Sequence, residues 1–525
     1  MATNKTKPEA SEGHQRITVK LAGLLAFTTF VFAILVAAVV ACLVGLRDPD
    51  ICWILAMGRF ITSHNALPFI DPFSSNLSTY AIVGRNLPLM QYQWLVEILF
   101  FKIWAQAGLQ GILATTGLVA CTALLALPMT YLVRGRVPML LSLIVLILGF
   151  SASYLRIFAR PEIFSMLYMA ILVAANLHYG LKSQKQMYVC AALSFLVMAL
   201  WSNTHMLFPL GLGFLALHGL VVIAESLIKE KKWPTYLPLL AFTICSSSLA
   251  TCINPWGHRI WYYIWRLAIS PVSYDNIDHQ APDLASPAAI ALIILGICYY
   301  LWFAYSIKSG RNRCSDLLPL AFLVVATVFA VKHAKLVPIA VILACAGLSE
   351  LNVRSRSVQN AADNFIAQVN RFLDELWKPM PFYGASLILL ITIVGAFLSS
   401  GVRTPQLPED TAVIKPPLKA IAFLREHPQK GRLLNEGLYG SCMTWYINPP
   451  IDIFMDSRFS MFEPALVAQY KEMMLCQNNW RQLMQDYKIA YVFAPVFMPI
   501  TQTLAKDPEW KTIYRDQDAM VLVKL

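Results

Sequence analysis

The stretch RDPDICWILAMGRFITSHNALPFIDPFSSN occupies residues 47–76 and follows directly on a long apolar run, residues 19–46. It carries three acidic side chains among aromatic and basic neighbours: Asp48, Asp50 and Asp71. The preceding run exceeds the ~20 residues that an α-helix needs to cross the hydrocarbon of a bilayer. Residues 47–92 are therefore expected to form a polar loop at a membrane surface, and Glu97 closes this acidic stretch.

The composition of the whole chain is that of a membrane protein. Of its 525 residues, 57% are hydrophobic and only 14% are charged, whereas soluble domains carry about 25% charged residues. The net charge of +12 comes from short basic clusters between apolar runs, which is the pattern of cytoplasmic loops in membrane proteins. We therefore expect membrane lipids as partners and no nucleic acid.

Further apolar runs follow the first one along the chain. They lie near residues 110–133, 137–152, 163–181, 187–202, 206–228, 236–253, 286–307, 316–331, 335–350 and 383–400. Together with residues 19–46 they predict about eleven transmembrane helices, and so an all-α polytopic membrane protein. The apolar segment 93–106 is shorter and holds Glu97 and Lys102, so an interfacial helix is expected there.

The basic residues orient these spans. If the N-terminal tail, residues 1–18, is cytoplasmic, every connection rich in lysine and arginine also falls on the cytoplasmic side, as the positive-inside rule requires. Residues 19–400 then form the membrane domain. An odd number of spans places the first loop and residues 401–525 on the outer side.

Basic side chains that return to the outer side are candidates for a functional site. They form a predicted cluster of Arg156, Arg160, Lys332, His333 and Lys335. A single basic residue at the end of a span can lift its charge to the lipid headgroups. Several such residues together, opposite the positive-inside loops and beside carboxylates, indicate a binding site instead. Arginine and lysine suit an anionic headgroup, so we expect this cluster to bind a donor phosphate.

A carboxylate facing such a cluster has a defined chemical role. It can take a proton from an acceptor hydroxyl, while the cations stabilise the charge that develops on a departing phosphate. These roles describe the transfer of a sugar from a lipid phosphate to a hydroxyl. We find no Walker, GxGxxG or HExxH pattern in the context that each requires.

Several motifs spread over nearly the whole chain carry a resemblance. They are Asp48-Pro-Asp50-Ile-Cys-Trp53, Gly58-Arg59-Phe60-Ile61, Asp71-Pro72-Phe73-Ser74, Trp94-Leu95-Val96-Glu97, Arg160-Pro161-Glu162, Asn203-Thr204-His205, Asn254-Pro255-Trp256-Gly257 and Phe454-Met-Asp456-Ser-Arg458. In these motifs the chain resembles a bacterial family of multi-spanning glycosyltransferases of the GT-C class. That class includes protein O-mannosyltransferases, oligosaccharyltransferase catalytic subunits and lipid A aminoarabinose transferases.

The resemblance implies roles for individual residues. The class carries its catalytic acid in the first external loop, which Asp50 matches best, with Asp48 as the competitor. Asp71 and Glu97 join them as candidate catalytic acids, and Asn203 and His205 are expected to orient sugar hydroxyls or the base.

The resemblance also implies the substrates and the location. The expected partners are a polyprenyl-phosphate or polyprenyl-diphosphate sugar and a glycan, lipid or protein acceptor, on the outer face of a bacterial cytoplasmic (inner) membrane. No organic cofactor is expected. The acids of the first loop and Glu97 are oxygen ligands suited to a divalent cation, but their spacing matches no closed metal motif, so metal dependence stays open.

The C-terminal part, residues 401–525, differs in composition from the rest. Helix-like stretches (417–427, 463–474 and 480–487) alternate with strand-like ones (451–454, 490–493 and 519–523), which predicts a small α/β domain. Asp456 and Arg458 follow the first strand-like stretch, where we expect a structural ion pair or turn. Acceptor recognition or a lid over the membrane site is the functional alternative. Cys442 and Cys476 are candidates for a disulfide if this part faces an oxidising compartment.

Two other classes of function compete with a glycosyltransferase. A transporter or flippase of a lipid-linked glycan also needs charged groups in the membrane, but it is expected to carry them near the middle of its spans and to show an internal repeat. This sequence shows neither feature. A non-catalytic membrane scaffold gives no reason for an acidic loop to face a cationic cluster.

Overall fold

The computed structural model describes residues 50–68, 70–78, 91–135, 137, 139–178, 182–269, 282–308, 317–354 and 416–525. Asp48, the predicted spans at 19–46 and 383–400, and most of the connection between 351 and 380 lie outside these residues.

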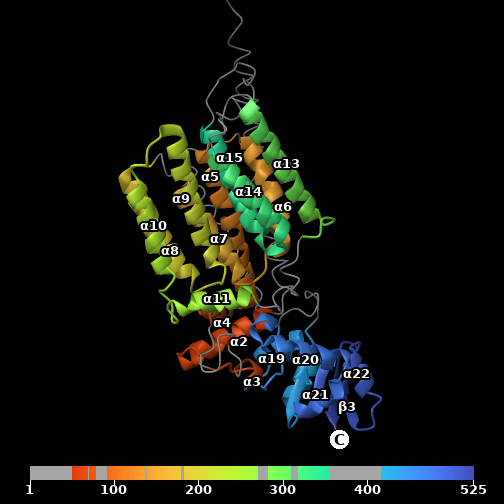
Figure 1. The fold of residues 1–525 in the computed structure, drawn as a ribbon. Coiled ribbons are helices and arrows are strands. Elements are labelled where there is room, and N and C mark those ends of the chain that lie inside the picture. The colour runs from red at the N-terminus through yellow and green to blue at the C-terminus, as the bar shows by residue number, and fades with distance from the viewer. Residues whose placement is uncertain are drawn as a thin grey trace, which may run out of the picture.

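A bundle of helices forms one end of the molecule (Figure 1). Its members are α4 (Trp94–Cys121), α5 (Leu127–Arg134), α6 (Met139–Ser153), α7 (Glu162–Asn176), α8 (Gln184–Trp201), α9 (Phe208–Glu230), α10 (Leu237–Ala250), α13 (Pro287–Lys308), α14 (Leu317–Lys332) and α15 (Val337–Arg354). Each predicted span between residues 110 and 350 overlaps one of these helices. Among the described residues, four helical stretches qualify as membrane spans by length and composition: Trp94–Arg134, Phe208–Glu230, Pro287–Lys308 and Ala334–Val353. Among the shorter apolar helices are Glu162–Asn176, Leu237–Ala250 and Leu317–Lys332.

Helix α15 is the central member of the bundle. It packs against α5, α6, α7 and α14, and small residues along it, such as Ala340, Ala344 and Ala346, are buried. Small side chains let helix backbones approach closely where lipid offers no hydrophobic driving force. By contrast, α13 leaves apolar side chains such as Ile297 and Leu301 exposed, as a helix in contact with lipid does.

Helix α4 contains a break that separates two parts with different roles. Gly108 has φ 59° and ψ −154°, a conformation that glycine adopts far more readily than residues with a Cβ. The break falls between the predicted interfacial segment, 93–106, and the predicted span that starts near 110. Beyond it the chain runs through a π-helical turn, Thr122–Ala126, into α5.

Two helices lie across the end of the bundle that faces the C-terminal domain: α2 (Asp50–His64) and α11 (Arg259–Ala268) (Figure 1). Helix α2 packs tightly on α4 at Gly58. A Cβ added at Gly58 would lie 2.1 Å from the carbonyl oxygen of Glu97, so only glycine fits without moving one of the helices. Short turns follow at α3 (Ser75–Ser78), Tyr154–Arg156, Ala334–Leu336 and Phe459–Met461.

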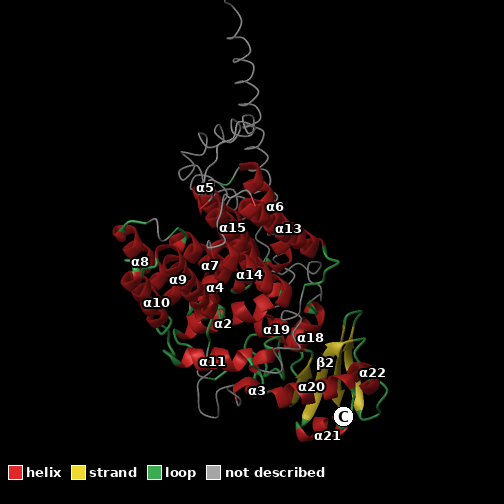
Figure 2. Ribbon diagram, turned by 45° about the horizontal axis from the view of Figure 1, so that its top comes forward, coloured by secondary structure: helices red, strands yellow, loops and turns green. Residues whose placement is uncertain are grey.

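Residues 416–525 form the expected α/β domain. Its strands are β1 (Arg432–Asn435), β2 (Ile489–Pro495), β3 (Trp510–Arg515) and β4 (Ala519–Lys524), in the order β1-β2-β4-β3. The first pair is parallel and the other two pairs are antiparallel. The helices are α18 (Leu418–Glu426), α19 (Gly437–Tyr446), α20 (Pro464–Leu475), α21 (Trp480–Asp486) and α22 (Pro499–Leu504). Figure 2 shows the strands side by side with helices around them.

The predicted strand at 451–454 is wrong. These residues form neither a helix nor a strand, and their backbone N–H groups pair with the first loop and with a side chain instead of a sheet. The N–H of Ile453 donates to the carbonyl of Phe73, and the N–H of Phe454 donates to Oδ1 of Asn435. A local sequence pattern does not indicate which partner takes the hydrogen bonds of the backbone. Conversely, β1 and β3 were not expected.

The C-terminal domain docks on the first loop through α19 and the segment that follows it. Arg59 of α2 donates to the carbonyls of Thr444 and Trp445 at 3.3 and 3.2 Å, and its guanidinium lies 4.5 Å from the centre of the Trp445 ring. The candidate disulfide between Cys442 and Cys476 is not formed, and both are free thiols. Instead, the Cys442 thiol contacts that of Cys52 in the interface between α19 and α2.

Candidate functional site

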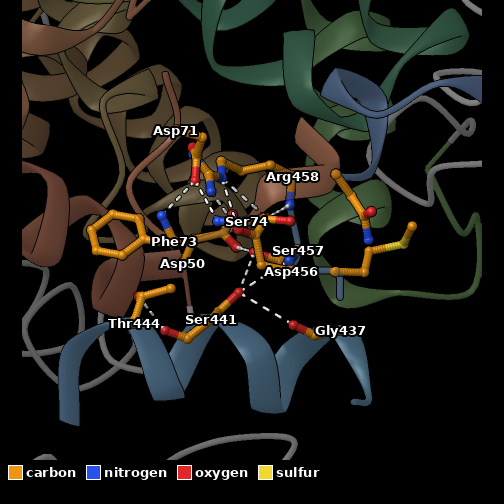
Figure 3. Close-up of polar contacts among 12 residues, drawn as sticks. Asp50, Asp71, Phe73, Ser74, Gly437, Ser441, Thr444, Asp456, Ser457 and Arg458 are labelled. Atoms are coloured by element: carbon orange, nitrogen blue, oxygen red, sulfur yellow. Dashed lines mark hydrogen bonds and ion pairs between the residues drawn. The ribbon is translucent and has the colours of Figure 1, made fainter. Parts of the chain in front are cut away.

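Asp50 is the first residue of α2 and lies where the bundle meets the C-terminal domain (Figure 3). Its Oδ2 is 2.9 Å from a guanidinium nitrogen of Arg160, and its Oδ1 accepts a hydrogen bond from the Ser457 hydroxyl. A helix N-terminus favours a negative charge. The carboxylate is thus held by a cation from the bundle and by a hydroxyl from the C-terminal domain.

A cavity of about 140 Å³ opens beside Asp50. Its charged and imidazole-bearing lining residues are Asp50, Arg160, Glu162, His205, Lys335 and Arg458. Ser457 and Tyr92 also line it. The cavity therefore joins residues from the first loop, from three connections between bundle helices and from the C-terminal domain.

The predicted cationic cluster divides in the structure. Arg160 and Lys335 line the cavity. Arg156 is outside the lining and makes an ion pair with Glu162 at 2.9 Å, which positions Glu162 at the start of α7. Lys332 is exposed at the end of α14, and the half-buried His333 follows it. Neither of the last two is among the residues lining the cavity.

Arg458 is the centre of a buried ion cluster behind the cavity (Figure 3). Its guanidinium is 2.5 Å from Oδ2 of Asp71 and 2.5 Å from Oδ2 of Asp456, and it lies 5.3 Å from the centre of the Trp53 ring. Burial by itself would lower the pKa of Arg458, but the two carboxylates raise it above its ordinary value. Arg458 is therefore a permanent cation at the cavity wall.

Asp71 is placed one layer away from the cavity. Its Oδ1 accepts hydrogen bonds from the backbone N–H groups of Phe73 and Ser74 at 2.9 Å each, and its Oδ2 binds Arg458. These contacts shape the first loop and connect it to the C-terminal domain. Asp71 therefore reaches the cavity through Arg458.

Glu97 is completely buried on α4 and also stands behind the cavity. Its Oε1 accepts a hydrogen bond from Gln93 at 3.3 Å, and Gln93 is a lining residue. Among the described residues, Oε2 of Glu97 has no hydrogen-bond partner.

Asn203 joins three elements and does not face the cavity. Its side-chain nitrogen donates to the carbonyls of Ala199 and Ile253 at 2.8 and 2.7 Å. Its oxygen accepts from the Trp94 indole at 2.9 Å. The amide thus ties the start of α4 to the ends of α8 and α10.

His205 lines the cavity and is held by Ser165. Its Nδ1 lies 2.7 Å from the Ser165 hydroxyl, which also accepts a hydrogen bond from the Trp201 indole. Burial, reinforced by the nearby cations Lys335, Arg160 and Arg156, lowers the pKa of His205 to about 3. The imidazole is therefore neutral at ordinary pH and offers hydrogen bonds rather than charge.

Within the described ranges, no three histidine, cysteine or acidic side chains are grouped closely enough to hold a metal ion. Asp50, Asp71 and Glu97 point to different partners: Arg160, Arg458 and Gln93.

Four residues of the C-terminal domain line the cavity: Ser457, Arg458, Ser460 and Met461. Of these, Arg458 was expected in an ion pair or turn, or alternatively in acceptor recognition or a lid, whereas Ser457 was not expected at the site. Ser457 binds Asp50, and Arg458 forms the expected ion pair with Asp456 while it also lines the cavity. The only sequence signal for them is the motif Phe454-Met-Asp456-Ser-Arg458. Nothing in that motif indicates that it would meet a loop some 400 residues earlier.

No protein-family model and no curated protein matches the sequence of this chain. Its structure is similar to that of the archaeal oligosaccharyltransferase AglB from Archaeoglobus fulgidus in complex with an inhibitory peptide and a dolichol-phosphate. That alignment covers 89% of this chain and 69% of AglB, with a TM-score of 0.50 and 11% sequence identity. ArnT from Cupriavidus metallidurans, bound to undecaprenyl phosphate, aligns over 95% of this chain and 98% of its own, with a TM-score of 0.48 and 14% identity. The likeness to the oligosaccharyltransferase shows that this chain has the fold of the GT-C glycosyltransferases, as its motifs predicted.

Proposed function

We propose that this chain is an integral membrane glycosyltransferase that moves a sugar from a polyprenyl-phosphate or polyprenyl-diphosphate donor to an acceptor hydroxyl. The observation that carries the proposal is the convergence of the Asp50 carboxylate with Arg160 and Lys335 on one cavity of about 140 Å³. An acid and two cations facing the same space are the groups that this reaction needs. The GT-C fold supports the same class of reaction.

In the proposed reaction, the acceptor oxygen forms a bond to the anomeric carbon of the sugar while the bond from that carbon to the phosphate oxygen breaks. Asp50 takes the proton of the acceptor hydroxyl. Arg160 and Lys335 stabilise the negative charge on the departing lipid phosphate. Because Arg160 pairs with Asp50 in this structure, the donor phosphate would compete with Asp50 for the guanidinium.

We further propose that the cavity faces the outer side of a bacterial cytoplasmic membrane, with residues 1–18 inside and residues 401–525 outside. The positive-inside pattern of the connections supports this orientation. The acceptor is proposed to be a glycan, a lipid or a protein.

The test compares wild type with Asp50→Asn in lipid nanodiscs, with a panel of polyprenyl-phosphate and polyprenyl-diphosphate sugars. Donor consumption and donor binding are followed separately. Loss of a general base is expected to lower turnover by roughly 10²- to 10⁴-fold while donor binding is kept. Arg160→Gln, by contrast, is expected to lower turnover and also to weaken donor binding. Asp486→Asn is the matched control, because Asp486 is an exposed acid on α21 of the C-terminal domain.

Two outcomes would contradict the proposal. Equal turnover in wild type and Asp50→Asn would remove Asp50 as the base and make Asp48 the next candidate. If wild type binds a donor without consuming it, and in sealed proteoliposomes moves it across the bilayer, the protein is a transporter of lipid-linked glycans.

A further inference from the structure

Ser457 is the contact through which the C-terminal domain reaches Asp50. Its hydroxyl donates a hydrogen bond to Oδ1 of Asp50. Its neighbours in the chain, Asp456 and Arg458, belong to the buried ion cluster with Asp71, so the peptide that carries Ser457 is anchored on both sides. Figure 3 shows Ser457 between Asp50 and α19.

Ser441 of α19 holds Ser457 from the other side. The N–H of Ser457 donates to the Ser441 hydroxyl oxygen at 3.0 Å, and the Ser441 hydroxyl donates to the Ser457 hydroxyl oxygen at 2.8 Å. The Ser441 side chain is completely buried and its second acceptor, the carbonyl of Gly437, is farther away at 3.4 Å. The proton of Ser441 is thus directed to Ser457, which leaves the single proton of Ser457 for Asp50.

The geometry points to a positioning role for Ser457: supported by Ser441, it orients the Asp50 carboxylate for proton transfer, so that the C-terminal domain is part of the active site. This inference rests on the proposed function. The reason is that the two carboxylate oxygens of Asp50 have different partners. Oδ2 is held by Arg160, which the donor phosphate is proposed to bind, whereas the Ser457 contact to Oδ1 does not depend on the cation that the donor takes.

The experiment measures kcat and KM of Ser457→Ala, Ser457→Thr, Ser441→Ala and the double variant Ser441→Ala/Ser457→Ala in nanodiscs. A hydrogen bond to a charged group is expected to be worth on the order of 10-fold or more in rate, so Ser457→Ala should lower kcat by that factor with the donor KM unchanged. Ser457→Thr keeps the hydroxyl and should restore most of kcat. If Ser441 acts only through Ser457, the double variant should be no slower than Ser457→Ala.

A pH profile separates positioning from a purely structural role. A hydrogen bond donated to a carboxylate favours its charged form, so the acid limb of kcat/KM should move to higher pH in Ser457→Ala. Glu162, His205 and Lys335 line the same cavity as Asp50 and are unchanged in Ser457→Ala, so the effect is measured as the difference between the profiles of this variant and wild type. Contact with Cys442 and burial raise the pKa of Cys52, and burial raises the pKa of Tyr92, so neither group titrates on the acid limb.

Thr444→Val is the matched control on α19. Among the described residues, the Thr444 hydroxyl donates to the carbonyl of Ser441, one turn from the contact with Ser457. This variant therefore perturbs the same helix and should keep the wild-type kcat. An equal loss of kcat in Thr444→Val and Ser457→Ala would overturn the positioning role. So would wild-type kcat in Ser457→Ala when Asp50→Asn is inactive. Full turnover in Asp50→Asn would instead overturn the proposed base itself.

Discussion

Arg458→Met tests whether the buried ion cluster holds the C-terminal domain on the first loop. Methionine keeps much of the side-chain length but removes the charge. Asp71 and Asp456 are buried, with Asp456 completely so, and each lies 2.5 Å from the guanidinium. Breaking a buried ion pair by removing one partner costs about 3–5 kcal/mol, because the other charge stays buried without compensation.

The expected loss can be followed as a change in melting temperature. A few degrees per kcal/mol is typical for a domain of about 100 residues, so Arg458→Met should lower Tm on the order of 10 °C. Full-length protein in nanodiscs can be followed by tryptophan fluorescence, since Trp53 lies against Arg458. Arg481→Met is the matched control, because the ion pair of Arg481 with Asp507 is at the surface and such pairs contribute little.

A variant that also removes the two carboxylate charges separates the effect of charge pairing from that of packing. In Arg458→Met/Asp71→Asn/Asp456→Asn no buried charge of the cluster remains, and replacing a whole buried ion cluster is often close to neutral. This triple variant should therefore be more stable than Arg458→Met alone. If Arg458→Met behaves like Arg481→Met, or if the triple variant is the least stable of the set, the cluster does not stabilise the interface by charge pairing.

Two further predictions follow from the same contacts. Gly58→Val should separate α2 from α4 at Glu97, which is expected to cost about 1–3 kcal/mol of stability and to abolish turnover. Gly213→Ala is the control and should be neutral or slightly stabilising, because an added Cβ there meets nothing within 4 Å. Equal melting temperatures for the two variants would refute the close approach of α2 to α4. The pKa of His205, about 3 when folded, lies below its unfolded value of ~6.5. The unfolded chain therefore binds the proton first, and stability should fall as pH decreases from ~6.5, by at most ~1.4 kcal/mol per pH unit. Between pH 7 and 5 the free energy of unfolding should fall less in His205→Gln than in wild type. Identical slopes of this free energy against pH would contradict the prediction.

Hydropathy located the helices of the bundle because burial in a membrane depends on residues that are neighbours in the chain. A run such as 206–228 must be apolar almost throughout to cross hydrocarbon, and α9 occupies Phe208–Glu230. The break at Gly108 likewise falls between two segments that differ in length and charge. Asp50 was predicted as the base from the resemblance to the GT-C class, with Asp48 as the competitor, and this role remains a prediction.

The roles of other polar residues could not be read in this way. Asn203 was predicted to orient sugar hydroxyls or the base, and in the structure its amide joins the carbonyls of Ala199 and Ile253 to the Trp94 indole. Whether a buried amide serves a ligand or the backbone depends on which unpaired groups surround it, and these come from other helices. The surroundings also decide between Lys332 and Lys335. The two are three residues apart, and of this pair only Lys335 lines the cavity.

The sequence by itself determined the membrane class, the positions of the helices, the α/β character of the C-terminal domain and the acidic first loop. Each depends on composition or on periodicity over a short stretch of chain. Only the tertiary structure decided that Asp71 pairs with Arg458, and that Ser457 meets Asp50 across 407 positions of sequence. Such pairings arise because a buried charge or hydroxyl must find a partner within about 3 Å, and the fold alone sets which residues come within that distance.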